Sequence, residues 1–239
     1  MRRLLTSTAV LMAGLSLVMP AQAATIVLDF EGVGDGASVD DFYNGGTDSF
    51  GNSGLDYGIS FSRTSLGIVD IDAGGNGNFG NEPSPDTVLF FLNGGAATMN
   101  VDAGFDAGFS FFYAADAFNA GSVVVYDGLN ATGNILANLS LTPNGGNCAG
   151  DPNGLPFCQF DPFGVSFAGI ARSVDFAGVA NQIAFDNITL GSAIPDPGPI
   201  SPSVPEPATW AMLLMGFGVV GGVLRRRREQ SSLLAAPLA

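Results

Sequence analysis

Two cysteines are the most reactive side chains that this sequence offers. Cys148 and Cys158 are the only cysteines, and the segment between them is rich in Gly and Pro. Such a pair favours a disulfide in an oxidising compartment, and closing the loop contributes about 2.5–3 kcal/mol in the chain-entropy model. Two thiolates without a histidine supply too few ligands for a zinc site. The sequence therefore predicts a Cys148–Cys158 disulfide.

The absence of histidine and lysine removes most enzymatic chemistry. No Ser-His or Cys-His pair can form, no Gly-x-Ser-x-Gly elbow is present, and no Schiff base is available. We therefore expect a protein that is not an enzyme. One alternative stays open, a Ca²⁺-dependent glycan hydrolase that works with two carboxylates. The sequence does not place any two carboxylates at the required separation.

Charge is sparse and one-sided. The chain has 22 acidic and 8 basic residues, and between residues 24 and 203 only Arg63 and Arg172 are basic, against 20 acids. Nucleic-acid binding relies on Lys and Arg that neutralise phosphates, so this composition excludes a nucleic-acid partner. An acidic surface instead attracts cations, Ca²⁺ in particular.

The N-terminus has the three parts of a secretory signal peptide. Two arginines precede an apolar run over residues 4–18, and the small-x-small site Ala21-Gln22-Ala23 follows. This pattern predicts a signal peptide over residues 1–23 with cleavage between Ala23 and Ala24. The alternative is an uncleaved membrane anchor.

The C-terminus contains an uncharged apolar stretch over residues 208–224. Its length is near the minimum for a helix that crosses a bilayer core of ~30 Å. Trp210 stands where an interfacial aromatic residue belongs, and the arginines at 225–228 are expected to stay in the cytoplasm. The sequence therefore predicts a single transmembrane helix with the body outside, and residues 229–239 form a short cytoplasmic tail.

The residues around this helix carry a more specific pattern. Val204-Pro205-Glu206-Pro207 precedes Trp210 and the apolar stretch, and Arg225, Arg226, Arg227 and Arg228 end it. Residues 204–228 resemble the PEP-CTERM sorting signal, although the tail after the arginines departs from the family pattern. The alternative is an ordinary tail anchor with a Pro-rich stalk.

The PEP-CTERM resemblance implies a partner and a destination. The partner is an exosortase, a membrane-embedded protease-transpeptidase, and the host is a Gram-negative bacterium that makes exopolysaccharide. The chain would cross the inner membrane, stay anchored there transiently, and then reach the cell surface or the extracellular matrix of a biofilm.

Residues 24–193 read as an all-β body. Short β-type runs alternate with turn residues, and no window keeps a helical period over ten residues. We expect an antiparallel two-sheet β-sandwich of jelly-roll type, followed by a Pro-rich linker over residues 194–203. The expected strands cover residues 25–30, 58–62, 66–71, 87–92, 98–102, 108–113, 122–127, 134–141, 164–167, 172–176 and 182–190.

Two segments of this body suggest a calcium site. Glu31 follows the first expected strand, and Asp186 lies in the last one. The pair resembles carbohydrate-binding jelly rolls, in which the first and last strands lie side by side and share a structural Ca²⁺. The resemblance implies Glu31 and Asp186 as side-chain ligands, with backbone carbonyls completing the shell. The Asp70–Asn78 loop is a second, more degenerate candidate.

These observations lead to one leading function. We expect an exported surface or matrix protein whose body is structural or adhesive, with extracellular polysaccharide as its candidate ligand. The glycan hydrolase remains the alternative, and the sequence does not name the glycan.

Overall fold

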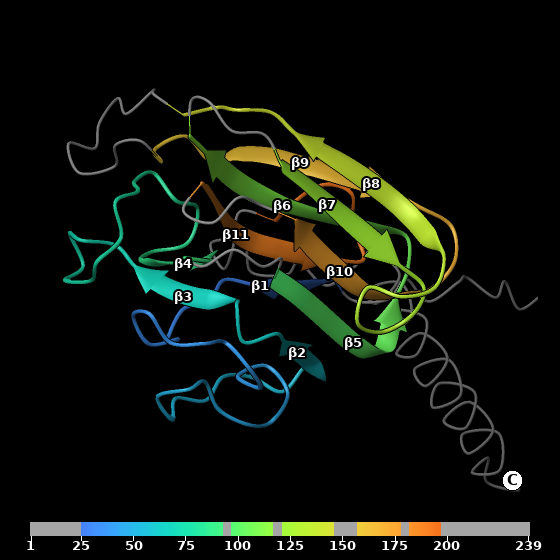
Figure 1. The fold of residues 1–239 in the computed structure, drawn as a ribbon, viewed down its shortest axis with the longest axis horizontal. Helices are drawn as coiled ribbons and strands as arrows, with labels where there is room; N and C mark the ends of the chain where they lie inside the picture. The colour runs from blue at the N-terminus through green and yellow to red at the C-terminus, as the bar shows by residue number, and fades with distance from the viewer. Residues whose placement is uncertain (1–24, 93–96, 117–120, 146–156, 178–181, 197–239) are drawn as a thin grey trace, which may run out of the picture. The chain divides into compact units, whose positions relative to one another are not determined.

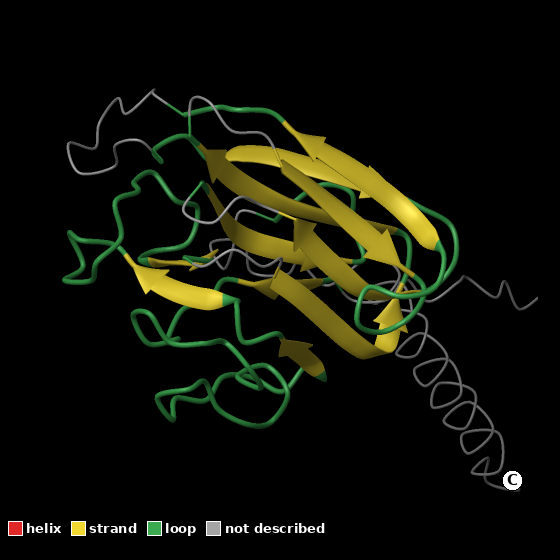
Figure 2. Cartoon of the chain, in the orientation of Figure 1, coloured by secondary structure: helices red, strands yellow, loops and turns green. Residues whose placement is uncertain are grey.

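The computed structural model describes residues 25–92, 97–116, 121–145, 157–177 and 182–196. The predicted signal peptide, sorting signal and tail, and most of the linker, lie outside these residues. The described part of the chain consists of strands and loops without a helix (Figure 2). Within it, no helix has the length and apolar character that a membrane crossing needs. The strands of the described residues are, in chain order, β1 (Ile26–Leu28), β2 (Ile59–Phe61), β3 (Leu66–Val69), β4 (Thr87–Phe90), β5 (Ala97–Phe105), β6 (Gly108–Ala115), β7 (Gly121–Tyr126), β8 (Ile135–Leu141), β9 (Asp161–Ser166), β10 (Ala171–Ala177) and β11 (Ile183–Leu190).

The strands form two antiparallel sheets (Figure 1). The first sheet has the order β3-β4-β11-β6-β9, with β1 also paired to β11. The second has the order β2-β5-β10-β7-β8. This arrangement confirms the expected all-β class and the two antiparallel sheets. Several strand bounds differ from expectation, and in β9 the difference has a physical reason, because this strand begins at Asp161 and includes Pro162. A proline is tolerated there because β9 is an edge strand and can spare one N–H group.

The main core lies between the two sheets and is rich in phenylalanine. Phe185 of β11 meets Phe111 of β6 with ring centroids 5.4 Å apart and Phe176 of β10 at 5.1 Å, both in edge-to-face geometry. Phe176 belongs to the second sheet, so these contacts join the two layers. Edge-to-face pairs add to the stabilisation that buried area alone provides.

A second, smaller core covers the other face of the first sheet. Ala184 belongs to it, whereas its neighbour Phe185 belongs to the main core, as the two-residue repeat of a strand requires. Its buried members are Ile68, Phe79, Val88, Phe90, Ala114, Phe157 and Ala184. Because both faces of β11 are covered, all eight of its residues are buried, and a polar side chain in this strand must find its partners inside the protein.

The last strand has two different neighbours along one edge. β6 pairs with β11 on one side, while β4 meets it at Phe185 and β1 meets it from Ile188 to Leu190 on the other. The register with β6 shifts between Asp186 and Thr189. Asp186 and Asn187 therefore lie where β4 stops and β1 starts, next to an irregularity in the ladder.

Candidate binding site at the junction of the first and last strands

Asp186 is a fully buried acid that holds the loop before β4. One carboxylate oxygen accepts hydrogen bonds from the Ser84 amide at 2.8 Å and the Ser84 hydroxyl at 2.9 Å. The other accepts from the same hydroxyl at 2.8 Å and from the Asn187 amide at 2.6 Å. Charge-assisted bonds of this kind are stronger than neutral ones, so Asp186 fixes Ser84 to the last strand.

Glu31 makes the matching connection from the first strand. Its Oε1 accepts hydrogen bonds from the amides of Asp86 and Thr87, both at 2.9 Å. The Ser84 hydroxyl also lies 3.1 Å from the carbonyl oxygen of Asp29. The two predicted ligands thus lie at one junction, where the end of β1, the loop before β4 and the middle of β11 meet.

The electrostatics of this junction are unbalanced. Burial raises the pKa of Asp186 to about 7, and the nearby Glu31 carboxylate adds to the rise. Burial also raises the pKa of Glu82 to about 7, with further contributions from Asp70, Asp186 and Asp72. Arg63 and Arg172 are the only basic residues of the described chain, and Arg172 binds the Asp102 carbonyl. The described chain therefore offers little positive charge that could balance the acids of the junction.

A recess of about 240 Å³ opens beside Glu31. Tyr43 forms part of its wall, and its hydroxyl accepts a hydrogen bond from the Phe30 amide at 2.8 Å and lies 3.5 Å from Asp29. Burial and the Asp29 charge raise the pKa of the Tyr43 phenol, so it stays protonated. Tyr57 stacks on Tyr43 with centroids 6.1 Å apart and is half-buried. The recess is lined by Val27, Asp29, Glu31, Gly32, Phe42, Tyr43, Ser53, Gly54, Leu55 and Tyr57. It combines carboxylates with aromatic rings.

Asn187 is a polar residue of this junction that the sequence did not single out. Its backbone is left-handed, with φ of 45°, and its side chain is fully buried. Neither amide atom has a hydrogen-bond partner among the described residues. Buried polar atoms without partners are rare in folded proteins. The only signal in the sequence was the polar pair Asp186-Asn187 inside an otherwise apolar strand.

The fit of a cation to this junction rests on two acids. Glu31 and Asp186 are close enough for the Glu31 charge to raise the pKa of Asp186. Among the described residues, no group of three or more acids or other metal-binding side chains comes together. Backbone and hydroxyl donors already occupy both oxygens of Asp186 and one oxygen of Glu31. In the structure as described, the two residues connect the strands, and a cation would need backbone oxygens as further ligands.

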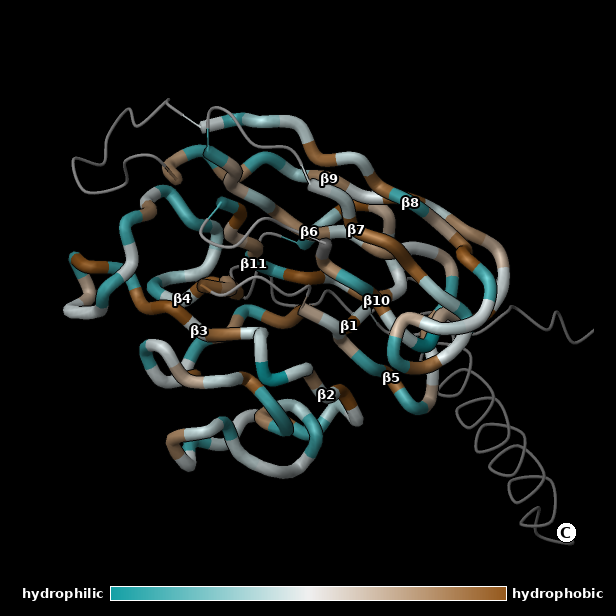
Figure 3. Tube along the Cα trace, viewed as in Figure 1, coloured by the Kyte–Doolittle hydropathy of each residue, from teal (hydrophilic) through white to brown (hydrophobic). Residues whose placement is uncertain are grey.

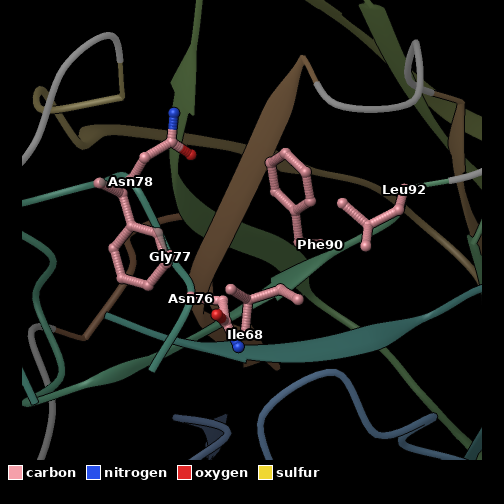
Figure 4. Close-up of a pocket in the computed structure, with 7 residues that line it drawn as sticks. Ile68, Asn76, Gly77, Asn78, Phe90 and Leu92 are labelled. Atoms are coloured by element: carbon pink, nitrogen blue, oxygen red, sulfur yellow. The ribbon is translucent and has the colours of Figure 1, made fainter. Parts of the chain in front are cut away.

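Hydrogen bonds within the second candidate loop, Asp70–Asn78, and one to Asp35 hold this loop in place. The Asp70 carboxylate accepts from the Ile71 amide at 2.7 Å, and the Asn76 side chain donates to Asp35 at 2.5 Å. A recess of about 120 Å³ lies between this loop and the side chains of Phe90 and Leu92 (Figure 4). Its lining is Ile68, Asn76, Gly77, Asn78, Phe79, Phe90 and Leu92, without an acid. The lining favours apolar groups over a metal ion.

The remaining predicted residues fall largely outside the described chain. Cys158 is buried, with 2% of its surface exposed, and its carbonyl accepts a hydrogen bond from the Asn81 side chain at 3.1 Å. Cys148 is not among the described residues, so the Cys148–Cys158 disulfide stays a prediction. The same is true of the signal cleavage site and of the placement of the sorting residues.

Comparison with known families identifies the C-terminus. Residues 203–228 match the PEP-CTERM protein-sorting motif. The chain carries a PEP-CTERM sorting signal. The match covers Val204, Pro205, Glu206 and Pro207 as well as the arginine cluster, as expected from the sequence. A PEP-CTERM signal implies recognition by an exosortase, export and transient association with the membrane. No curated protein and no solved structure matches the chain, so the function of the body has to be argued from its own residues.

Proposed function

We propose that this PEP-CTERM protein is a non-enzymatic component of the cell surface or exopolysaccharide matrix, with a β-sandwich that is structural or adhesive and binds glycan. The observation that carries the proposal is the sorting motif at residues 203–228, attached to an all-β body. The absence of histidine and lysine supports a binding role over catalysis. We place the protein outside the inner membrane of a Gram-negative bacterium after an exosortase has processed it.

The order of the strands favours the jelly-roll type of sandwich. The eight strands other than β2, β3 and β4 have the order β1-β11-β6-β9 in the first sheet and β5-β10-β7-β8 in the second. Each sheet then holds four strands, which is the number expected for an eight-stranded jelly roll. Jelly rolls occur in lectin domains, and this occurrence is compatible with a glycan ligand but does not identify one.

We place the glycan contact in the recess beside Glu31. The carboxylates of Asp29 and Glu31 can accept hydrogen bonds from sugar hydroxyls, and the half-buried Tyr57 offers a ring against which a sugar can pack. The acidic surface repels uronic-acid and sulfated polysaccharides. The ligand is therefore expected to be a neutral or cationic glycan.

The purified body, residues 24–196, tests this proposal on immobilised neutral, cationic and acidic glycans. We expect binding to a neutral or cationic glycan and no reducing ends released from any of them. Tyr57→Ala should weaken binding roughly tenfold by removing the stacking ring. Tyr126→Ala, another half-buried tyrosine outside the recess, is the matched control. Equal loss in both variants would remove the recess from the proposal, and release of reducing ends would favour the hydrolase.

Calcium at Glu31 and Asp186 is the second part of the proposal. The described residues contain only two arginines, and a bound cation would neutralise the acids of the junction. Ca²⁺ prefers oxygen ligands in flexible geometry, and both carboxylates belong to segments that meet there. The ion would stabilise the contact between β1 and β11 and would take no part in a reaction.

Melting of the body with millimolar Ca²⁺ and with a chelator is the corresponding measurement. A ligand at 100 times its Kd stabilises the folded state by about 2.7 kcal/mol, which corresponds to several degrees for a domain of this size. Glu31→Ala and Asp186→Ala should each abolish the calcium-dependent difference. Asp106→Ala, at an exposed acid between β5 and β6, should keep it. If wild-type curves coincide with and without calcium, the site does not exist.

A further inference from the structure

The two sheets end in edge strands, and most of these edges are protected. An open edge presents unpaired N–H and C=O groups that can pair with another chain. β3 is covered by the segment before it, because Gly36 donates to the Gly67 carbonyl at 2.8 Å and Gly67 donates to the Ala37 carbonyl at 3.0 Å. The other strands at the ends of the two sheet orders are β2, β9 and β8.

The β2 and β9 edges are protected in different ways. Ile59 and Phe61 of β2 donate to the carbonyls of Tyr43 at 3.1 Å and Asp40 at 2.8 Å, so a loop occupies that edge. β9 carries Pro162, which has no N–H group, next to the acid Asp161. Proline and charge on an edge strand are both devices that prevent association.

β8 differs from the other edges. Within the described residues it pairs only with β7, and it extends over seven residues, Ile135–Leu141. No residue between Asp127 and Asp151 is charged, and β8 contains no proline. From Ala137 to Leu141 its residues alternate between buried and exposed, and hydrophobic and hydrophilic residues follow one another along the strand (Figure 3). Asn138 and Ser140 are exposed, and Ile135 keeps 58% of its surface in solvent. Charge and proline are therefore both absent from this edge, and the one irregularity is a register shift against β7 that leaves Leu136 as an extra residue near the start of the strand.

We propose that β8 is a self-association site, at which it pairs antiparallel with β8 of a second copy of this chain. The distribution of charge points to a second copy as the partner. An excess of acids makes two copies repel each other wherever their acidic surfaces meet. The uncharged β8 edge is a surface on which two copies can approach without that repulsion. A two-fold axis brings a strand against itself in antiparallel orientation.

Side-chain alternation is compatible with this pairing. In an antiparallel pair, residues opposite each other point to the same face of the sheet. With Asn138 opposite its own copy, Ala137 meets Leu139 of the other copy, within the part of β8 that follows the register shift at Leu136. The buried face of one β8 therefore continues the buried face of the other, and the second sheet becomes continuous across two molecules. This interface is separate from the glycan recess, and it does not depend on the proposed function.

Sedimentation velocity of the body over a range of concentrations tests the proposal. Both cores are built from residues between Leu28 and Leu190, so residues 24–196 contain every element of the fold. We expect a monomer–dimer equilibrium that strengthens with added salt, because salt screens the repulsion between acidic surfaces. Asn138→Lys combined with Ser140→Lys should weaken dimerisation about tenfold or more, since like charges would face each other across the new pair.

The control is a pair of lysines at two exposed loop positions, Thr47→Lys with Ala73→Lys. These substitutions lower the net negative charge by the same amount, so they should leave dimerisation unchanged or strengthen it. Unchanged melting of both variants would show that each is folded. Hydrogen exchange at low and high protein concentration should protect amides of β8 and not those of β2, β3 or β9. A body that stays monomeric at all concentrations, or a dimer whose β8 amides are unprotected, would overturn the proposal.

Discussion

Glu206→Ala is expected to trap the full-length precursor in the inner membrane. The apolar stretch over 208–224 and the arginines that follow are sufficient for insertion and orientation, so the anchor should form normally. Pro205 and Pro207 keep the segment before the helix extended, and Glu206 presents the charge that a basic protease pocket can read. Pulse-chase labelling with membrane fractionation measures the fraction of precursor that is processed, which should fall from nearly all to nearly none.

Two further variants separate recognition from anchoring. Glu229→Ala makes the same chemical change just outside the matched residues 203–228, and it should be processed like the wild type. Neutral residues in place of Arg225–Arg228 should disturb orientation and allow the uncleaved chain to be secreted. If the Glu206→Ala protein loses its tail as fast as the wild type, the motif is not read through this carboxylate, and the segment serves only as a tether.

Asp186→Ala should cause a large loss of folding stability. The substitution leaves the buried amides of Ser84 and Asn187 without acceptors, and each unsatisfied buried donor costs about 1–3 kcal/mol. We expect a total of about 3 kcal/mol or more, or roughly 6–12 °C in melting temperature for a domain of this size. Asp106→Ala should stay within about 0.5 kcal/mol of the wild type, as exposed substitutions do. Equal stability of both variants in chemical denaturation would show that the junction does not hold the fold together.

Asp186 also predicts the direction in which folding stability changes with pH. Burial raises the pKa of Asp186 from 3.8 to about 7, so between these values the folded state binds a proton that the unfolded chain has lost. Stability should therefore fall as the pH rises from about 4 to 7 and level off above 7. Glu82 acts in the same direction, because its pKa is also raised to about 7. In chelator-containing buffer, Asp186→Asn combined with Glu82→Gln should make the folding stability nearly independent of pH in this range. A wild-type protein whose folding stability increases from pH 5 to 7 would contradict the prediction.

The sequence predicted those parts of the structure that depend on local pattern. Short β-type runs, such as residues 108–113, predicted strands, and abundant turn residues predicted their short lengths. The predicted start of the strand that contains Pro162 was residue 164, whereas β9 begins at Asp161. Proline argues against a strand unless the strand is known to lie at an edge. Which strands form edges depends on sheet order, and sheet order depends on contacts between residues far apart in the chain.

The candidate site was predictable only in part, for the same reason. The resemblance to carbohydrate-binding jelly rolls indicated Glu31 and Asp186 and the pairing of the first and last strands, and β1 does pair with β11. The role of Ser84 was not visible, because a serine in a loop carries no signal of its own. The recess around Tyr57 needs residues from several loops, whose positions follow from packing and not from spacing in the sequence.

The pairing of β1 with β11 also sets when this protein can fold during export. In export led by the predicted signal peptide, β1 leaves the translocation channel first, yet its partner among the described strands, β11, ends only at Leu190. A contact between such distant segments forms slowly, because the intervening chain must first be ordered. The first sheet can close only after nearly the whole body has crossed the membrane, shortly before residues 203–228 arrive there. The order of translocation therefore couples completion of the fold to arrival of the sorting signal, so that the exosortase meets a body that has only just become able to fold.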